Sequence, residues 1–138
     1  MTPIEQTILT PPDGNCFAAC VASILELPID DVPNFKQPAD HSQEWWVQWQ
    51  RWLEVRNLAF VGWPNPISDD PHCVADILRG YSICTVRYEY SWGSINHAVV
   101  CRDGEIVWNP HPLRDTRQHD SIVDWIVFRV INPGKNIR

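Results

Sequence analysis

The stretch that decides the fold lies near the N-terminus and reads Asp13-Gly14-Asn15-Cys16-Phe17-Ala18-Ala19-Cys20-Val21-Ala22-Ser23-Ile24-Leu25. It predicts a loop that turns into a helix, because Asn15 is a residue type favoured at helix N-caps and the apolar residues after it recur at helical spacing. Cys16 would then lie in the first helical turn, where the helix dipole and unpaired backbone N–H groups favour a thiolate. Cys16 is therefore the candidate nucleophile. The alternative is that it is one more small buried apolar residue.

A second stretch, residues 95–110, supplies the groups that such a nucleophile needs. Two short apolar runs flank Asp103-Gly104, a dipeptide favoured in tight turns, so we expect a β-hairpin in which His97 starts one strand and Asn109 ends the next. The two residues are almost equidistant from the turn and should lie side by side. The amide carbonyl of Asn109 would then fix the imidazole tautomer. Cysteine, histidine and asparagine in this chain order are what a papain-type site requires.

The order of these parts resembles the papain-like cysteine peptidase superfamily, and within it the bacteriocin-leader peptidases and the small phage and bacterial proteins related to them. The residues that carry the resemblance are Gln6, Gly14 to Cys20, Leu27 to Pro33, His97 to Val100 and Asn109 to Pro112. The run Asp13-Gly14-Asn15-Cys16 is also similar to the cysteine motif of ovarian-tumour-type deubiquitinases. That match is short, and the spacing from His97 to Asn109 fits the first family better. The middle of the chain, about residues 36–90, shows hardly any resemblance.

The resemblance implies an α+β, papain-like fold in which an N-terminal catalytic helix packs on an antiparallel β-sheet. It implies a Cys16-His97-Asn109 triad, with the oxyanion stabilised by backbone N–H groups at the helix start and by Gln6 or Asp13. The sequence departs from the family at two places. Relatives usually carry aspartate where Asn109 stands, and their oxyanion glutamine lies closer to the cysteine, at the place that Thr10 occupies here.

Length and composition indicate one soluble domain over residues 1–138. The chain is 44% hydrophobic and 20% charged, as in ordinary globular proteins. Its formal charge of −6, without a basic stripe, argues against a nucleic-acid partner. We find neither a secretory signal nor an apolar run long enough to span a bilayer. We therefore expect no membrane association and a cytoplasmic location, in the host cytoplasm if the chain is phage-encoded.

The five cysteines are an odd number, which fits a reducing compartment better than a disulfide framework. Cys16 and Cys20 are one helical turn apart, but no second pair of Cys or His residues stands at metal-ligand spacing. We therefore expect neither a metal nor another cofactor. Cys20, Cys73, Cys84 and Cys101 are interpreted as buried apolar residues.

The middle of the chain predicts alternating helices and strands. We expect a helix from Gln43 to about Arg56 capped by Ser42, a strand over 58–63, a helix capped by Asp70, and strands over 81–88 and 122–131. The first of these helices carries a tryptophan stripe formed by Trp45, Trp49 and Trp52. Such a stripe can stack on a ligand, but its spacing is also that of a core-facing helix, which is the interpretation we favour.

Residues 89–96 are expected to form a loop that leads to His97 and borders the site. Tyr90 and Trp92 in this loop are candidates for gripping an extended substrate, and Asn15 is a third candidate for substrate contact. The competing interpretation is that the aromatic residues pack over the histidine. His111 and His119 are interpreted as surface residues.

Together the parts predict a cysteine-dependent hydrolase that cleaves an amide bond in a peptide or protein substrate, as a peptidase, isopeptidase or amidase does. Two alternatives stay open. A catalytically inactive papain-like phage protein could bind a host protein through its tryptophan-rich middle, and such a role should survive Cys16→Ala. A cell-wall amidase fits the triad but not the lack of an export signal and a wall-binding module. The oligomeric state does not follow from the sequence.

Overall fold

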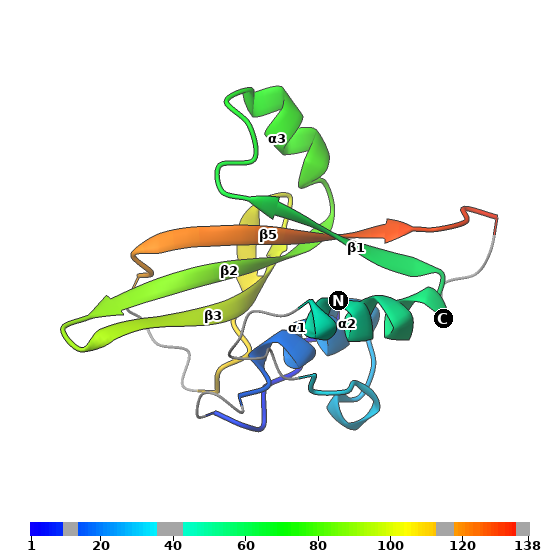
Figure 1. Ribbon diagram of the computed structural model, residues 1–138, viewed down its shortest axis with the longest axis horizontal. Coiled ribbons are helices and arrows are strands. Elements are labelled where there is room, and N and C mark those ends of the chain that lie inside the picture. The colour runs from blue at the N-terminus through cyan, green and yellow to red at the C-terminus, as the bar shows by residue number, and fades with distance from the viewer. Residues whose placement is uncertain (10–13, 36–42, 113–117, 135–138) are drawn as a thin grey trace.

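A five-stranded antiparallel sheet organises the structure, a computed structural model that describes residues 1–9, 14–35, 43–112 and 118–134. The strand order is β1-β5-β2-β3-β4, with β1 (Leu58–Pro64), β2 (Tyr81–Tyr90), β3 (Gly93–Arg102), β4 (Glu105–Trp108) and β5 (Ser121–Val130). The helices α1 (Cys16–Leu25) and α2 (Glu44–Glu54) lie on one face, and α3 (Pro71–Ile77) lies on the other (Figure 1). A single-turn 3₁₀ helix, η1 (Ile29–Asp31), follows α1. The expected α+β class with an antiparallel sheet is confirmed.

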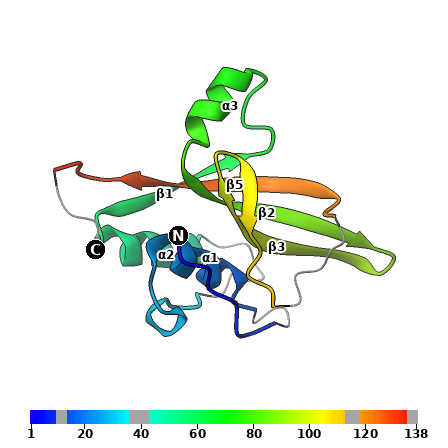
Figure 2. The ribbon, with the colours of Figure 1, turned by 180° about the vertical axis from the view of Figure 1, so that it is seen from behind.

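The helix α1 begins at Cys16, as the spacing of its apolar residues predicts. Its buried face consists of small residues, Ala18 to Ser23, so the helix backbone can approach the sheet closely. The helix ends at Leu25, followed by Glu26 in the left-handed conformation, with φ 57°, whose N–H donates to the carbonyl of Ala22. The N-terminal segment runs beside α1 on the face of the sheet opposite α3 (Figure 2).

The tryptophan stripe of α2 belongs to the hydrophobic core. Trp49 and Leu53 are fully buried, and Trp45 and Trp52 are partly buried against the same cluster. The ring of Phe17 joins α1 to this cluster, with its centroid 5.2 Å from those of both Trp45 and Trp49. The prediction that the stripe is core is therefore confirmed. The proposed cap, Ser42, lies outside the described residues.

The outer edge of β1 is closed by a side chain from α2. Gln50 donates from Nε2 to the carbonyl of Phe60 and accepts from its N–H at Oε1, both at 3.0 Å. One carboxamide thus pairs with both backbone groups of an edge-strand residue, as a neighbouring strand would. This contact also fixes α2 over β1.

Two hairpins place the predicted site residues. The turn between β3 and β4 is formed by Asp103 and Gly104, with φ 52° and 84°, which confirms the predicted tight turn. The turn between β2 and β3 comes later than expected, because the strands stay paired as far as Tyr90 and Gly93. The loop predicted over 89–96 is therefore wrong, and His97 lies within β3 rather than at its start.

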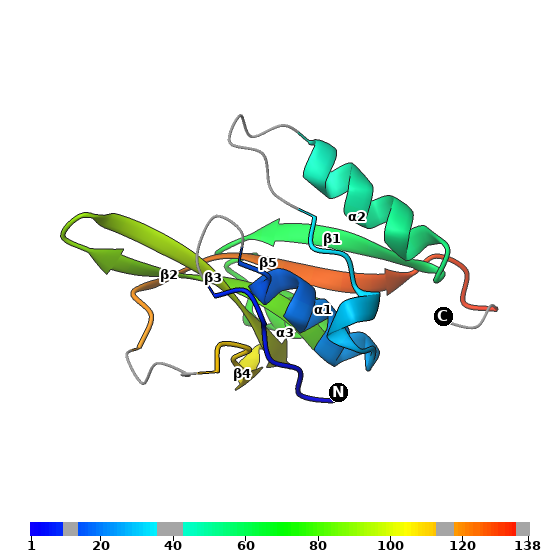
Figure 3. The same cartoon turned by 90° about the horizontal axis from the view of Figure 1, so that it is seen from below.

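The long β2–β3 hairpin projects beyond the other strands as an arm (Figures 1 and 3). Its turn is tight, and Gly93 has φ 146°, a conformation that other residues rarely adopt. We call residues 87–96 the arm. Both α1 and α2 begin on the side of the molecule from which the arm projects (Figure 3).

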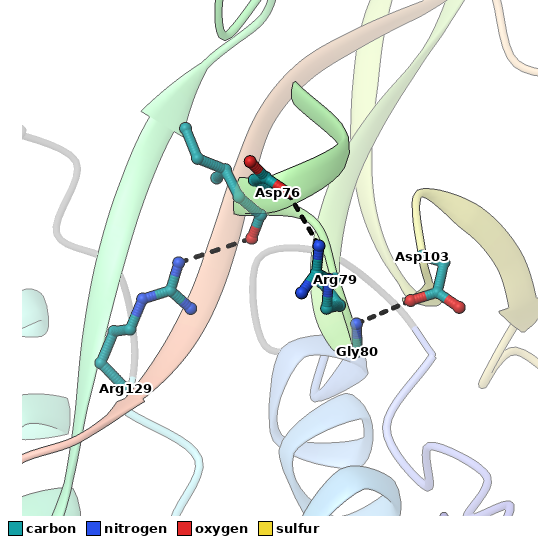
Figure 4. A network of polar contacts seen from close by, with 6 residues as sticks. Asp76, Arg79, Gly80, Asp103 and Arg129 are labelled. Carbon is teal, nitrogen blue, oxygen red and sulfur yellow. Dashed lines mark hydrogen bonds and ion pairs between the residues drawn. The ribbon is translucent and has the colours of Figure 1, made fainter. Parts of the chain in front are cut away.

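Polar contacts fasten α3 to the far end of the same sheet (Figure 4). Asp70 caps the helix as predicted, accepting from the N–H of His72 at 2.9 Å. The N–H of Gly80 donates to Oδ1 of Asp103 at 2.8 Å, and the N–H of Asp103 donates to the carbonyl of Gly80 at 2.9 Å. The turn before β2 is thereby joined to the turn between β3 and β4.

The helices in the described parts of the chain were compared with the length and hydropathy that crossing a bilayer requires. Of these helices, none meets both requirements.

Candidate active site

Asn15 links the N-terminal segment to the start of α1. Its side-chain oxygen accepts hydrogen bonds from the backbone N–H groups of Thr7 and Ile8, each at 2.9 Å, and its Nδ2 donates to Oγ1 of Thr7. The predicted side-chain cap is therefore wrong, because these N–H groups occupy the oxygen that would have capped the helix. Asn15 is 5% exposed. Its side chain thus bonds to the protein's own N-terminal segment, and its role in substrate contact stays a prediction.

The sulfur of Cys16 lies among backbone N–H groups. Those of Ala98, Phe17 and Cys16 itself all act to lower the pKa of the thiol. Burial acts in the opposite direction and is the larger effect, so the pKa of Cys16 is raised above its ordinary value. The expectation of a thiolate in the free protein is therefore corrected. The helix terminus does favour the anion, but loss of water outweighs it.

His97 and Asn109 are in direct contact, as the hairpin predicts. Nε2 of His97 lies 2.7 Å from Oδ1 of Asn109. The strands reach this arrangement through a bulge at Val107, which shifts the pairing of β4 by one residue. Continued beyond β4, the shifted register puts Asn109 opposite Val99, on the same face as His97. The asparagine therefore reaches the histidine diagonally.

The same oxygen of Asn109 fixes the tautomer of His97. It also accepts a hydrogen bond from the backbone N–H of His111, at 3.0 Å. A backbone N–H can only donate, so the atom it meets is the carbonyl oxygen of the carboxamide, and Nε2 of His97 must carry the hydrogen that points to it. Nδ1 is left as the unprotonated nitrogen of the neutral ring. It is also the nitrogen nearer the main chain.

The backbone of β3 passes beside the cysteine at the residue that follows His97. The N–H group beside the Cys16 sulfur belongs to Ala98, the residue that follows His97. Within the described residues no hydrogen bond joins the sulfur to the imidazole itself. The thiol of Cys16, in α1, thus lies beside the backbone of β3 one residue after His97.

The imidazole of His97 is neutral at neutral pH. Burial lowers its pKa below the usual 6.5, the hydrogen bond to Asn109 opposes this effect, and the nearby ring of His111 adds to the lowering. The rings of His97 and His111 meet edge to face, with centroids 6.3 Å apart. A neutral imidazole is able to accept a proton as a general base.

His111 is the residue of this site that the sequence analysis missed. It was interpreted as a surface residue, but it is half-buried and contacts both members of the His97–Asn109 pair. The signal that could have found it is its spacing. An asparagine side chain commonly accepts from the backbone N–H two residues later, which here brings residue 111 back toward the asparagine.

Gln6 lies close to the site but its amide is engaged. It is 5% exposed, its backbone N–H donates to the carbonyl of Pro110 at 2.9 Å, and its Nε2 donates to the carbonyl of Ile8 at 3.0 Å. Within the described residues its Oε1 is buried without a partner. A role for Gln6 in binding the oxyanion stays a prediction. Asp13, the other candidate, lies outside the described residues.

Tyr90 and Trp92 lie at the tip of the arm. Their rings stack with centroids 5.2 Å apart and an angle of 4° between planes, and Trp92 is 70% exposed. His97 pairs with Val86, four positions before Tyr90, so the tip is about 13 Å from the histidine along the strand. The structure therefore does not bring these rings to the triad.

A metal site was sought in the described ranges 1–9, 14–35, 43–112 and 118–134. There, no three Cys, His, Asp or Glu side chains come together in a way that could hold a metal ion.

Comparisons of the chain with protein-family models, with curated proteins and with solved structures returned no match. The functional interpretation therefore depends on the residues of this chain.

Proposed function

We propose that this protein is a papain-like cysteine hydrolase that cleaves an amide bond. The observation that carries the proposal is the hydrogen bond between Nε2 of His97 and Oδ1 of Asn109, on the strand whose next N–H group lies beside the Cys16 sulfur. This arrangement supplies a nucleophile, a base in the required tautomer and a group that orients the base.

The first chemical step is attack of the thiol on the substrate carbonyl. Nδ1 of His97 accepts the proton as the sulfur of Cys16 forms a bond to the carbonyl carbon, and the carbonyl oxygen becomes an oxyanion. The backbone N–H groups of Cys16 and Phe17 are the nearest donors, because they lie in the first turn of α1 and next to the sulfur. The positive end of the helix dipole stabilises the same charge.

The second step releases the amine and then the acid. The protonated His97 gives its proton to the amide nitrogen as the carbon–nitrogen bond breaks, leaving a thioester on Cys16. A water molecule attacks the thioester while Nδ1 of His97 accepts its proton, and the thiol leaves with that proton. Asn109 keeps the ring in one orientation through both steps.

The second candidate function is that of a binding protein that has kept the scaffold without the chemistry. The observation in its favour is the exposed stacked pair Tyr90 and Trp92, because exposed aromatic side chains are enriched at protein interfaces. The buried, protonated thiol is also what an inactive scaffold would tolerate.

A panel of substrates with matched cysteine variants tests the proposal. Peptide, isopeptide and muropeptide substrates are incubated with wild type, Cys16→Ala and Cys73→Ala, the last changing a half-buried cysteine in α3. We expect hydrolysis of at least one class by wild type and Cys73→Ala, and a loss of about a thousandfold or more in Cys16→Ala. Hydrolysis that persists in Cys16→Ala would refute the proposed nucleophile. Absence of hydrolysis together with host-protein binding that survives Cys16→Ala would favour the binding protein.

A further inference from the structure

Two edges of the sheet are closed by single residues that pair with the strand as a neighbouring strand would. Gln50 closes the outer edge of β1 by pairing with both backbone groups of Phe60. Asp120 closes the edge of β2 where the arm extends past β5. Its N–H donates to the carbonyl of Arg87 at 2.9 Å, and its Oδ2 accepts from the N–H of Glu89 at 2.6 Å. Such closure is how proteins prevent unwanted pairing at exposed strand edges.

The contacts of Asp120 also show in which direction the backbone N–H and C=O groups of β3 point within the arm. The carbonyl of Arg87 and the N–H of Glu89 face Asp120, and therefore face away from β3. Their partners in the β2–β3 register are Asn96 and Ser94. In an antiparallel ladder such pairs do not exchange hydrogen bonds, so the N–H and C=O groups of Asn96 and Ser94 point outward, to the free side of β3.

Among the residues that the structure describes, none pairs with that side of β3 along the arm. β4 pairs only with residues 100–102 of β3, and within the described residues no hydrogen bond reaches the outward backbone groups of Ser94 and Asn96. Ala98 continues the same alternation, and its outward N–H lies beside the sulfur of Cys16. The open edge therefore runs directly to the candidate nucleophile.

We propose that an extended polypeptide segment binds here as an added strand, pairing with the outward groups of Ser94 and Asn96 and entering the site at Cys16. This deepens the proposed function and rests on it for one point, that the bound segment is the substrate. The groups recur every two residues, a repeat of about 6.6 Å that matches the main chain of any extended peptide. Recognition is therefore through the substrate backbone and tolerates many side chains.

The proposal narrows the substrate class. Two or more residues on one side of the scissile bond must be free to extend beside β3, which an unfolded or loosely folded polypeptide allows. A small amide has no main chain to pair. The exposed ring of Trp92 at the arm's tip then lies beyond the paired segment, where only a longer peptide would reach it.

Proline substitutions test the proposal, because proline removes an N–H and is tolerated where that N–H points away from the sheet. The probe is a fluorescent library of random-sequence peptides, and binding to the Cys16→Ala protein is measured by fluorescence anisotropy. We expect Asn96→Pro and Ser94→Pro each to weaken binding about tenfold, the effect of one or two lost hydrogen bonds. Ser91→Pro, in the turn of the same arm, is the matched control and should bind as before. Circular dichroism checks that each variant is folded, and if one is not, the other carries the test.

The outcomes separate this inference from the proposed function. The proposal of an added strand is overturned if Asn96→Pro and Ser94→Pro bind the library as well as Ser91→Pro does. It is also overturned if the library does not bind at all. If wild type hydrolyses peptides and Asn96→Pro does so equally well, the proposed function stands and the proposed binding at the edge of β3 is wrong. If no substrate of the panel is hydrolysed but peptide binding is lost in Asn96→Pro, binding at the edge of β3 stands and the proposed function falls.

Discussion

At the scale of single residues, Asn109 controls the chemistry of its neighbour through one oxygen atom. That oxygen accepts hydrogen bonds from Nε2 of His97 and from the backbone N–H of His111. The backbone bond holds the carboxamide in place, and the held oxygen selects the tautomer of the imidazole. An oxygen with two acceptor sites is needed here, rather than an asparagine in particular.

The effect of substituting Asn109 should therefore depend on whether the new side chain can still accept these hydrogen bonds. Asn109→Ala removes the acceptor and should lower kcat/KM about 10- to 100-fold, because the wrong tautomer and ring orientation become populated. Asn109→Asp keeps both hydrogen bonds and should stay within about tenfold of wild type. Steady-state kinetics on a cleaved peptide measures the difference. Equal losses in the two variants would show that the oxygen does not orient His97.

The pH dependence of activity follows from the neutral pair, by which we mean the protonated thiol of Cys16 and the neutral imidazole of His97. Burial lowers the pKa of His97 below 6.5, and the ring must be neutral to accept the thiol proton, so kcat/KM should rise with pH, with the midpoint of the rise below pH 6.5. Asn109→Asp should move this limb to higher pH, since a carboxylate raises the pKa of the imidazole. A pH–rate profile checks both. A rise of kcat/KM centred near about pH 4, as in sites with a preformed thiolate, would contradict a neutral Cys16 and His97.

At the scale of secondary structure elements, the sheet is bounded by polar side chains as much as by its strands. Gln50 provides both a donor and an acceptor to Phe60, so α2 is attached to β1 by hydrogen bonds as well as by packed rings. Asn15 does the same between the N-terminal segment and α1. Of these two contacts, the one made by Asn15 fixes the start of the helix that carries Cys16.

Gln50→Ala should lower the free energy of unfolding by about 1–3 kcal/mol, because it leaves a partly buried N–H and C=O without partners. Gln48→Ala changes the same residue type on the same helix, and the side chain of Gln48 makes no hydrogen bond in the described part of the chain. That control should stay within about 0.5 kcal/mol of wild type. Urea unfolding followed by circular dichroism measures both. A similar loss in both variants would mean that helix propensity, rather than the closed edge, is responsible.

At the scale of the whole molecule, the sheet separates two hydrophobic clusters. The larger cluster lies under α1 and α2 and includes Trp49, Leu53 and Phe60, and the smaller lies under α3 and includes Leu78 and Trp125. The rings of Phe17, Phe35, Trp52 and Phe60 all lie within 6.0 Å of that of Trp49, measured between centroids. Aromatic contacts from α1, α2, the sheet and the segment after η1 therefore converge on one indole.

Trp49→Ala should destabilise the fold by about 3–5 kcal/mol, because it leaves a large cavity among rings that cannot all collapse into it. Trp92 is 70% exposed at the tip of the arm, and Trp92→Ala should change the free energy of unfolding by only about 0.5 kcal/mol. Chemical denaturation of the two variants compares the same substitution inside and outside the core. Comparable losses would contradict the assignment of the stripe to the core.

The sequence by itself determined the elements whose signals are local. The start of α1 at Cys16, the cap at Asp70, the turn at Asp103-Gly104 and the last strand are all present where the spacing of residues places them, to within a residue or two. It also placed Asn109 close to His97, although the turn alone would put Asn109 opposite Ala98, and the bulge at Val107 is what brings it to the face of His97. These features depend on interactions between residues close together in the chain.

Only the tertiary structure decided what depends on burial and on contacts between distant segments. The local helix signal at Cys16 favours a thiolate, yet burial raises its pKa, and burial is a property of the assembled fold. The open edge of β3, the closure of the other edges by Gln50 and Asp120, and the place of His111 beside His97 likewise arise from segments that meet only on folding. The spacing of residues along the chain predicts that a segment is a strand. It does not predict which backbone N–H and C=O groups of that strand remain unpaired after folding.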